Sequence, residues 1–404
     1  MDKQTQGIIL SARYVFPVAS PVIREGAVFV RDGVIQDVDG LARLAKRYRA
    51  EVMELGNGIL MPGFINGHVH LELGPMHARL DPGDDFPAWI FGIVKKRLTL
   101  SKKRAAEGVR QGIDVLIRSG VAGVGEISTM GIDRQPLLDA PLYTVLFRET
   151  TSVGRLLGRP YVGSATMEER PFLHAPYSTA SEVYREASKR FSAYGTHIAE
   201  SIDEYRLVTG QENNFSRRLG PLVRRDPAMC RSSSPVDYLY RLGFIKSGTT
   251  LVHFVHTDRR DLELASSCGA GIVLCPRSNA YLGVGLPDVG LLHAYSRLGI
   301  GTDGLSSNYS LDMMDEIRFL YLISRPVLKS RAEAFVIGAA TIAGARALFI
   351  EDRLGSIEKG KRPGLIYLDT DVAKNLCLSI INTPSSQIKN LYATVFGPGN
   401  VAAG

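Results

Sequence analysis

Short apolar runs alternate with helical patterns through most of this chain, and that alternation limits its possible folds more than any other feature. After residue 59, most apolar runs are followed by a stretch with apolar residues at helical spacing, as at residues 103–119 and 181–193. Strands that alternate with helices pair as a parallel sheet. The apolar runs lie at residues 59–60, 121–124, 142–147, 172–173, 195–199, 250–255, 272–274 and 300–302.

This pattern predicts an α/β fold. Strand candidates of this number, with helices between them, fit a closed (β/α)8 TIM barrel over residues 59–352. An open, doubly wound sheet is the alternative arrangement for such a pattern. We expect the barrel to be the catalytic unit, because polar residues follow many of its strands.

Strand character without helices occupies both ends of the chain. Residues 8–10 open one strand, and residues 26–35 form a hairpin around the turn at Asp32 and Gly33. Strand-like apolar residues return at 365–368. The simplest arrangement is one small β-sandwich domain built from residues 1–58 and 353–404.

Composition excludes several classes of protein. The chain has 404 residues, of which 45% are hydrophobic and 22% charged, as in ordinary globular proteins. Its four cysteines have no CxxC spacing, which argues against a disulfide scaffold and fits a cytoplasmic protein. The net charge of +7 is a mild excess without interleaved aromatic residues, so we expect no nucleic-acid partner. We also expect no membrane segment, because no apolar stretch is long enough.

Histidines at strand ends point to a metal site. His68 and His70 are two apart at the end of a strand, so their side chains point to the same side. His197, His253 and Asp303 follow other apolar runs. In a barrel, the C-terminal ends of the strands meet at one face. Three imidazoles and a carboxylate there would bind Zn²⁺ or Fe²⁺ and leave a position open for water.

The motifs around these residues resemble the amidohydrolase superfamily. Residues 62–70 read PGFINGHVH, residues 196–201 read THIAES, residues 251–253 read LVH and residues 301–303 read GTD. The segments HAPY at 174–177 and CPRSN at 275–279 are similar to the branch with nucleoside and base deaminases and triazine chlorohydrolases. The resemblance covers nearly the whole chain.

The resemblance implies a role for each motif residue. It makes Glu200 the carrier of a proton to the substrate ring, and His253 the group that orients the attacking water. Residues 172–174 contain no lysine, which the family's binuclear members use as a bridge, so one divalent metal is expected, zinc or alternatively iron. The implied metal ligands are His68, His70, His197 and Asp303.

Each of these residues also has a purely structural interpretation. Asp303 could cap a helix, and His253 competes with His256 for the place facing the site. His174 could contact the substrate or be a hydrogen-bonded structural histidine. Glu72 could face the pocket or pair with Arg79.

The substrate expectation rests on a departure from the nucleoside deaminases of this branch. They have Trp-Leu followed by a glutamate that holds the ribose hydroxyls, whereas this chain has Trp89-Ile90 followed by KKR at 95–97. Arg97 or Arg148 could instead pair with an anionic group of the substrate. Aminodeoxyfutalosine deaminases resemble the chain at 68–73 and 86–97, which makes 6-amino-6-deoxyfutalosine, of menaquinone biosynthesis, the leading substrate. The expected substrate contacts are Glu72, Trp89, Arg97, Arg148 and His174.

The expected activity is therefore metal-dependent hydrolytic deamination of an aminopurine nucleoside, with release of ammonia. Methylthioadenosine, S-adenosylhomocysteine, guanine and cytosine are alternative substrates. A chlorohydrolase or a cyclic amidohydrolase could use the same site, and a barrel without activity is a third possibility. We expect a small-molecule substrate as partner, and a homodimer is possible.

Overall fold

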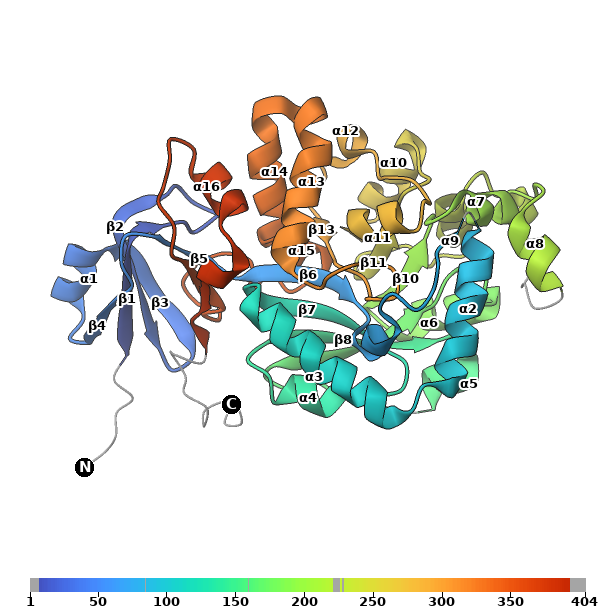
Figure 1. Cartoon of the computed structure of the whole chain (residues 1–404), viewed down its shortest axis with the longest axis horizontal. Helices are drawn as coiled ribbons and strands as arrows, with labels where there is room; N and C mark the ends of the chain where they lie inside the picture. The colour runs from blue at the N-terminus through green and yellow to red at the C-terminus, as the bar shows by residue number, and fades with distance from the viewer. Residues whose placement is uncertain (1–6, 84, 159, 221–225, 227–228, 393–404) are drawn as a thin grey trace.

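The computed structural model describes residues 7–392, apart from residues 84, 159, 221–225, 227 and 228. It contains a closed barrel with an open sheet at one end (Figure 1). In the part of the chain that is described, no helix combines the length and the apolar character needed to cross a bilayer.

The barrel contains eight parallel strands in the order β10-β11-β12-β13-β6-β7-β8-β9, so the predicted (β/α)8 architecture is confirmed. Most of its strands are buried along their whole length, as expected for parallel strands covered by helices on the outside. The strands are β6 (Phe64–Val69), β7 (Val121–Ser128), β8 (Tyr143–Thr150), β9 (Met167–Leu173), β10 (Tyr194–Ile198), β11 (Thr249–His253), β12 (Gly271–Leu274) and β13 (Leu298–Ile300).

Helices cover the barrel on the outside (Figure 1). Several begin at side-chain caps, as at Ser101, which accepts the backbone N–H of Arg104, and at Asp258, which forms a capping box with Asp261. The helices of this layer are α2 (Phe86–Thr99), α3 (Lys102–Arg118), α4 (Arg134–Leu138), α5 (Val153–Leu157), α6 (Ser181–Arg190), α7 (Ile202–Val208), α8 (Asn214–Leu219), α9 (Pro235–Arg241), α10 (Arg259–Ser267), α11 (Pro276–Tyr281), α12 (Val289–Leu292), α13 (Met313–Leu328), α14 (Ala332–Ala339) and α15 (Ile342–Ala347).

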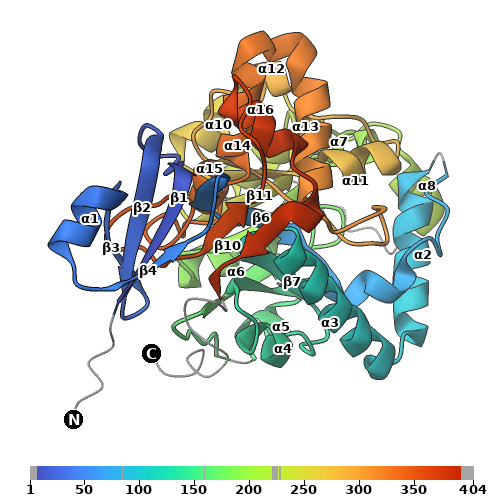
Figure 2. The same ribbon diagram turned by 60° about the vertical axis from the view of Figure 1, so that its left-hand side comes forward.

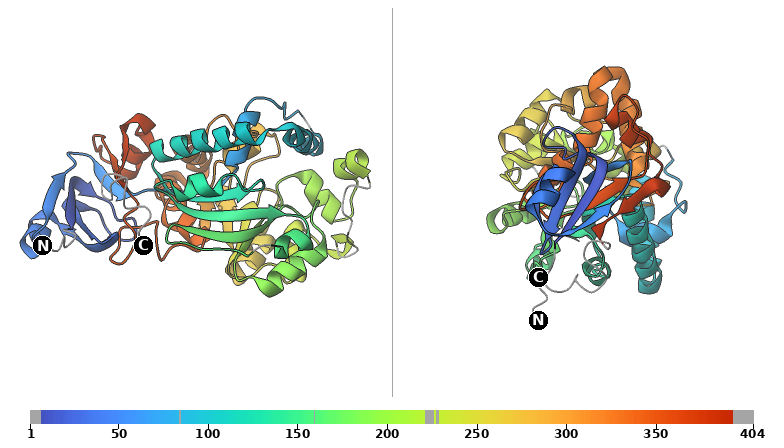
Figure 3. Two further views of the ribbon diagram at one scale, coloured as in Figure 1. Left: turned by 90° about the horizontal axis from the view of Figure 1, so that it is seen from below. Right: turned by 90° about the vertical axis from the view of Figure 1, so that its left-hand side faces the viewer.

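The second sheet is built from both ends of the chain, as predicted, and its two parts lie side by side in both views of Figure 3. Its seven strands follow the order β15-β14-β5-β1-β2-β3, and β4 pairs with the first half of β1. The predicted hairpin turn is present, with positive φ at Asp32 (52°) and Gly33 (72°). The elements are β1 (Ile8–Val15), β2 (Ile23–Arg31), β3 (Val34–Gly40), β4 (Glu51–Glu54), β5 (Ile59–Pro62), β14 (Leu365–Leu368) and β15 (Ile388–Asn390), with helices α1 (Leu41–Arg47) and α16 (Leu376–Asn382) beside them.

One predicted barrel strand belongs to this sheet instead. The run at residues 59–60 is part of β5, which pairs with β1 and with β14. The first barrel strand is β6, which starts just after Gly63. Both strands are buried along their length, so burial of the apolar residues alone could not distinguish the two partners.

The sheet and the barrel share their cores. Ile366 and Leu368 of β14 pack in the cluster that joins the barrel and its helices, whereas Leu365 and Tyr367 pack inside the sheet. This follows from the alternation of side chains along a strand. Figure 2 shows β14 and β15 in red beside the barrel helices.

Candidate active site

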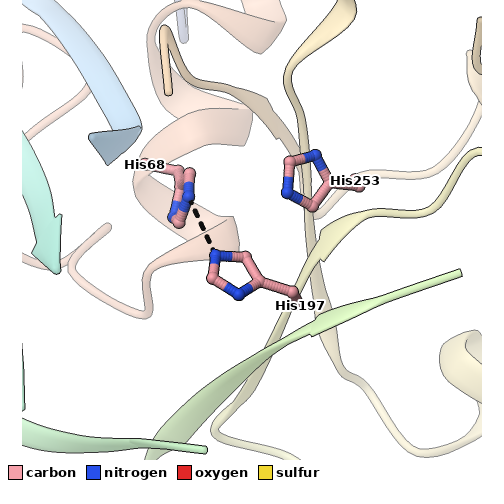
Figure 4. Close-up of side chains that lie close together, drawn as sticks. All are labelled: His68, His197 and His253. Atoms are coloured by element: carbon pink, nitrogen blue, oxygen red, sulfur yellow. Dashed lines mark hydrogen bonds between the residues drawn. The ribbon is translucent and has the colours of Figure 1, made fainter. Parts of the chain in front are cut away.

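Three barrel strands and the loops that follow them bring the predicted metal ligands to one end of the barrel. His68 lies in β6 and His70 directly after it, His197 lies in β10, and Asp303 follows β13. The carboxyl ends of parallel barrel strands share a face, so these side chains converge. Figure 4 shows the rings of His68, His197 and His253 turned toward one another.

The ligand atoms are spaced as ligands of one ion would be. The Nε2 atoms of His68 and His197 are 3.3 Å apart. Asp303 Oδ1 lies 3.6 Å from Nε2 of His68 and 3.6 Å from Nε2 of His70. Tetrahedral ligands at bond lengths of about 2.0–2.1 Å are about 3.3–3.4 Å apart. The ligand atoms of His68, His70 and Asp303 form one group of this kind, and His197 joins it through His68. This spacing is suited to a divalent cation such as zinc.

The imidazoles of His70 and His197 are neutral and present lone pairs. Burial, together with the nearby His68, holds the pKa of His197 well below its ordinary value and lowers that of His70 to about 4. The Nδ1 of His197 lies 2.9 Å from the carbonyl oxygen of His174, to which it donates. That bond leaves the lone pair on Nε2, which faces His68. Neutral imidazoles are the form that binds a metal.

Asp303, the predicted carboxylate ligand, is held in its ionised form. Its Oδ2 accepts hydrogen bonds from the hydroxyls of Ser278 (2.7 Å) and Ser307 (3.0 Å). The backbone N–H of Gly304 donates to Oδ1 at 2.7 Å. Burial opposes ionisation of this carboxyl, but its contacts with His68 and the other nearby histidines outweigh burial and hold its pKa well below the ordinary value.

Glu200 and His253 face each other beside this ligand set. Nε2 of His253 is 3.6 Å from Oε2 of Glu200, and its Nδ1 lies 3.2 Å from the side-chain amide of Asn279. Burial, with the neighbouring carboxylates of Asp303 and Glu204, raises the pKa of Glu200 well above its ordinary value. Burial lowers the pKa of His253 to about 3. Burial therefore favours the protonated form of Glu200, next to the neutral imidazole of His253.

Glu204 of α7 stabilises the turn that carries Glu200. Its carboxylate accepts the backbone N–H groups of Ala199 (3.0 Å) and Glu200 (3.1 Å). Ala199 has φ of 52°, a conformation that costs free energy for residues other than glycine. The buried Glu204 stabilises this turn and so places Glu200.

Two of the predicted substrate contacts, Arg97 and His174, lie near the predicted metal ligands, whereas Trp89 packs in an apolar cluster. The ring of Trp89 stacks on Phe86, with centroids 5.9 Å apart, in an apolar cluster under α2. Arg97 lies 3.5 Å from the carboxylate of Glu149, and Nε2 of His174 lies 3.9 Å from the same carboxylate. Glu149, His174 and His197 bring one ligand atom each within 4.8 Å of one another.

Two predicted contacts have other partners. The carboxylate of Glu72 accepts the backbone N–H groups of Thr129 and Met130, both within 3.0 Å, and so holds the turn after β7. Arg148 contacts the carbonyl oxygen of Pro160 (2.8 Å) and Glu169 (3.3 Å). Successive residues of a strand point to opposite faces, so Arg148 points away from the face where Glu149 lies.

Several residues of the site were not among the predicted ones. Ser278 and Asn279 belong to the quoted CPRSN segment, but only the fold shows that they contact Asp303 and His253. Glu149 is an acidic residue just after the apolar run at 142–147, which is the same signal that identified His197 and Asp303. Nothing in the sequence around Glu204 pointed to a role in the site, because the residue lies within a short helix and not at a strand end.

Comparison with known proteins agrees with this site. The model of the amidohydrolase family matches residues 59–402. The chain belongs to the amidohydrolase family. As a family member it is a hydrolase acting on C–N bonds other than peptide bonds.

Relatives of known name share most of the chain's length. It is 29% identical to the aminodeoxyfutalosine deaminase of a Nitratiruptor species, over 88% of this chain and 90% of the relative. It is 29% identical to the adenosine deaminase of Helicobacter pylori, over 84% of this chain and 86% of the relative.

Solved structures share the fold. An adenosine deaminase from Xanthomonas campestris with bound zinc superposes with a TM-score of 0.81 at 22% identity, covering 95% of this chain and 90% of that one. The Helicobacter pylori aminofutalosine deaminase in complex with methylthio-coformycin superposes with a TM-score of 0.80 at 24% identity, covering 94% and 99%.

Proposed function

We propose that this amidohydrolase is a metal-dependent hydrolytic deaminase of an aminopurine nucleoside. One observation carries the proposal: a buried acid, Glu200, faces His253 beside a set of neutral imidazoles and an ionised Asp303. That combination offers an activated water and a separate proton donor, which are the two groups that hydrolytic deamination needs. The relatives named as nucleoside deaminases support the choice of substrate class.

His68, His70, His197 and Asp303 would hold the cation, for which we propose zinc. When bound, such an ion lowers the pKa of a water molecule toward about 7, so that hydroxide is available at neutral pH.

The chain's own residues direct the two proton transfers. His253 orients the water toward the carbon that bears the amino group, and the carboxylate of Asp303 accepts the proton that the water loses. Glu200 delivers its proton to the ring nitrogen next to that carbon. The proton on Asp303 then passes to the amino group, the C–N bond breaks and ammonia leaves. The added hydroxyl returns its remaining proton to Glu200, and the carbon keeps the oxygen of the water as a carbonyl.

The proposed substrate is 6-amino-6-deoxyfutalosine, a purine nucleoside with a benzoate group. Arg97 of α2 supports this choice, because its side chain lies at the carboxylate of Glu149 near the histidines. In the described part of the chain, Nη2 of Arg97 is buried without a hydrogen-bond partner, so it can still donate to an anionic group. Arg148 is not part of this proposal.

The test is ammonia release by zinc-loaded protein from 6-amino-6-deoxyfutalosine, methylthioadenosine, adenosine, guanine and cytosine. We expect turnover of the first to exceed that of the others. Turnover of adenosine or of a free base instead would keep the reaction and reject the role of Arg97. No ammonia from any compound would reject deamination, and chloride release from a chlorotriazine would then identify a different leaving group.

A variant of the proton donor tests the mechanism itself. Glu200→Gln should keep the metal content of the wild type and lose activity by about 100-fold to 10,000-fold, the usual contribution of a general acid. Full activity in this variant would show that another group donates the proton.

A further inference from the structure

A second buried carboxylate lies at the mouth of the barrel, and the proposed reaction does not use it. Glu149 lies near the end of β8, and its side chain is 8% exposed. Its Oε2 accepts the hydroxyl of Thr129 at 2.9 Å and faces Arg97 at 3.5 Å. The metal set and the proton donor are complete without it.

Glu149 stays ionised in this position. The guanidinium of Arg97 and the hydroxyl of Thr129, both at Oε2, favour the ionised form of this carboxyl. An ionised buried carboxylate needs hydrogen-bond donors around it. Its Oε2 has such donors, whereas Oε1 faces His174 beyond hydrogen-bond distance.

The gap between Glu149 and His174 is suited to a hydroxyl group. Nδ1 of His174 lies 2.6 Å from the hydroxyl of Ser178, and Nε2 lies 3.9 Å from Oε1 of Glu149. The Ser178 hydroxyl also lies 3.2 Å from the carbonyl oxygen of Ala175. In the tautomer in which Ser178 donates to Nδ1, its closer partner, the ring proton is on Nε2 and points toward the carboxylate. A ligand hydroxyl beside this pair would accept from Nε2–H and donate to Oε1.

We propose that Glu149 and His174 form a subsite that binds the hydroxyl groups of the substrate's sugar, with Arg97 holding the carboxylate in place. The inference rests on the proposed nucleoside deaminase activity and adds the residue that selects ribonucleosides. A site built to hydrogen-bond a hydroxyl discriminates strongly against a ligand that lacks it, because its buried polar groups are then left unpaired.

The experiment compares a ribonucleoside with its 2′,3′-dideoxy counterpart in zinc-loaded enzyme. Wild-type protein should have a lower KM for the ribonucleoside. Glu149→Gln should raise that KM by about 10-fold to 100-fold and leave the KM for the dideoxy compound nearly unchanged. Glu169→Gln is the matched control, because Glu169 is an equally buried carboxylate that pairs with Arg134 and Arg148 on the other side of the strands. It should leave both KM values as in the wild type.

Other outcomes would overturn the inference. An equal loss for both nucleosides in Glu149→Gln would indicate a structural role, and loss of a metal equivalent would make Glu149 a ligand. If that variant does not fold, His174→Gln must show the same selective loss, and equal losses there would reject the subsite. If the wild type deaminates no nucleoside at all, the proposed function fails first and the inference fails with it. If the wild type deaminates nucleosides and Glu149→Gln has the wild-type KM for both compounds, the inference fails but the proposed function stands.

Discussion

Burial determines the chemistry of the individual side chains in this site. It keeps His70 and His197 neutral, so that their nitrogens can bind a metal, and it keeps Glu200 protonated, so that this residue can act as an acid. Asp303 is the exception, because its hydrogen bonds and neighbouring histidines outweigh burial. One environment thus produces a neutral acid and an ionised ligand close together.

At this scale we predict that His197→Ala loses metal and activity together. The imidazole of His197 is one of the proposed ligands, and alanine leaves the set without the lone pair that faces His68. Metal content measured by elemental analysis should fall to a small fraction of the wild-type value. The control is His256→Ala, since His256 bonds to the carbonyl oxygen of Val284. Normal metal content in His197→Ala would remove this residue from the ligand set.

At the scale of the elements, close approach of two barrel strands brings the ligands together. Gly301 follows β13, and a Cβ there would lie 2.6 Å from the backbone nitrogen of His68 and 2.7 Å from its oxygen. Only glycine allows β13 and β6 to approach at this point. The loops after the strands are held in turn by buried carboxylates such as Glu204 and Glu316.

We therefore predict that Gly301→Ala lowers both stability and metal affinity. Overpacking of this kind costs about 1–3 kcal/mol, and here the strain falls on the backbone of a ligand. Thermal unfolding and zinc titration would measure the two effects. Gly338→Ala on α14 is the control, because a Cβ there meets nothing within 4 Å. If Gly301→Ala had the melting temperature and zinc affinity of the wild type, the two strands would be able to move apart without loss of stability.

Glu316 of α13 makes stability depend on pH. Its carboxylate accepts the N–H of Arg277 at 3.0 Å, and burial, only partly offset by Arg277, raises its pKa to about 8. The folded pKa lies above the unfolded value, so the stabilising contribution is complete below about pH 4.5 and is lost as the pH rises toward 8.

The free energy of unfolding should accordingly fall between about pH 5 and pH 8 more steeply in the wild type than in Glu316→Gln. The difference in slope is at most about 1.4 kcal/mol per pH unit. Urea unfolding at several pH values measures it, with the exposed Glu263→Gln as control. If the free energy of unfolding changed with pH in the same way in the wild type and in Glu316→Gln, Glu316 would have the same pKa in the folded and unfolded states.

At the scale of the whole molecule, the sheet and the barrel are joined through one strand. The side chains of β14 alternate between the two cores, with Leu368 in the cluster that includes the barrel and Tyr367 in the sheet. The hydroxyl of Tyr367 also accepts the N–H of Gly58 at 2.9 Å, next to β5. We expect the two parts to unfold together.

Leu368→Ala tests that cooperativity. It should destabilise the protein by about 2–5 kcal/mol, as large-to-small changes in a core do. The only tryptophan is Trp89, on the barrel side, so its fluorescence reports on a region far from the mutation along the chain. Fluorescence and circular dichroism midpoints should shift equally, and Lys389→Ala on β15 should shift neither. Separate midpoints would show that the sheet unfolds independently.

The sequence by itself determined the barrel, the sheet from both chain ends and the convergence of His68, His70, His197 and Asp303. These features follow from local periodicity and from residues at strand ends, which every barrel brings to one face. Only the tertiary structure decided that residues 59–62 join the sheet, because the residues of an apolar run do not indicate which strand it pairs with.

The tertiary structure also decided which polar side chains meet at the site. It placed Arg97 near the histidines and turned Arg148 away, and it brought Glu149 to His174 from another strand. Adjacent residues of one strand differ only in the face that they present, and the register of the barrel sets that face. The local sequence carries the chemical groups, whereas contacts between distant strands determine which of them act together.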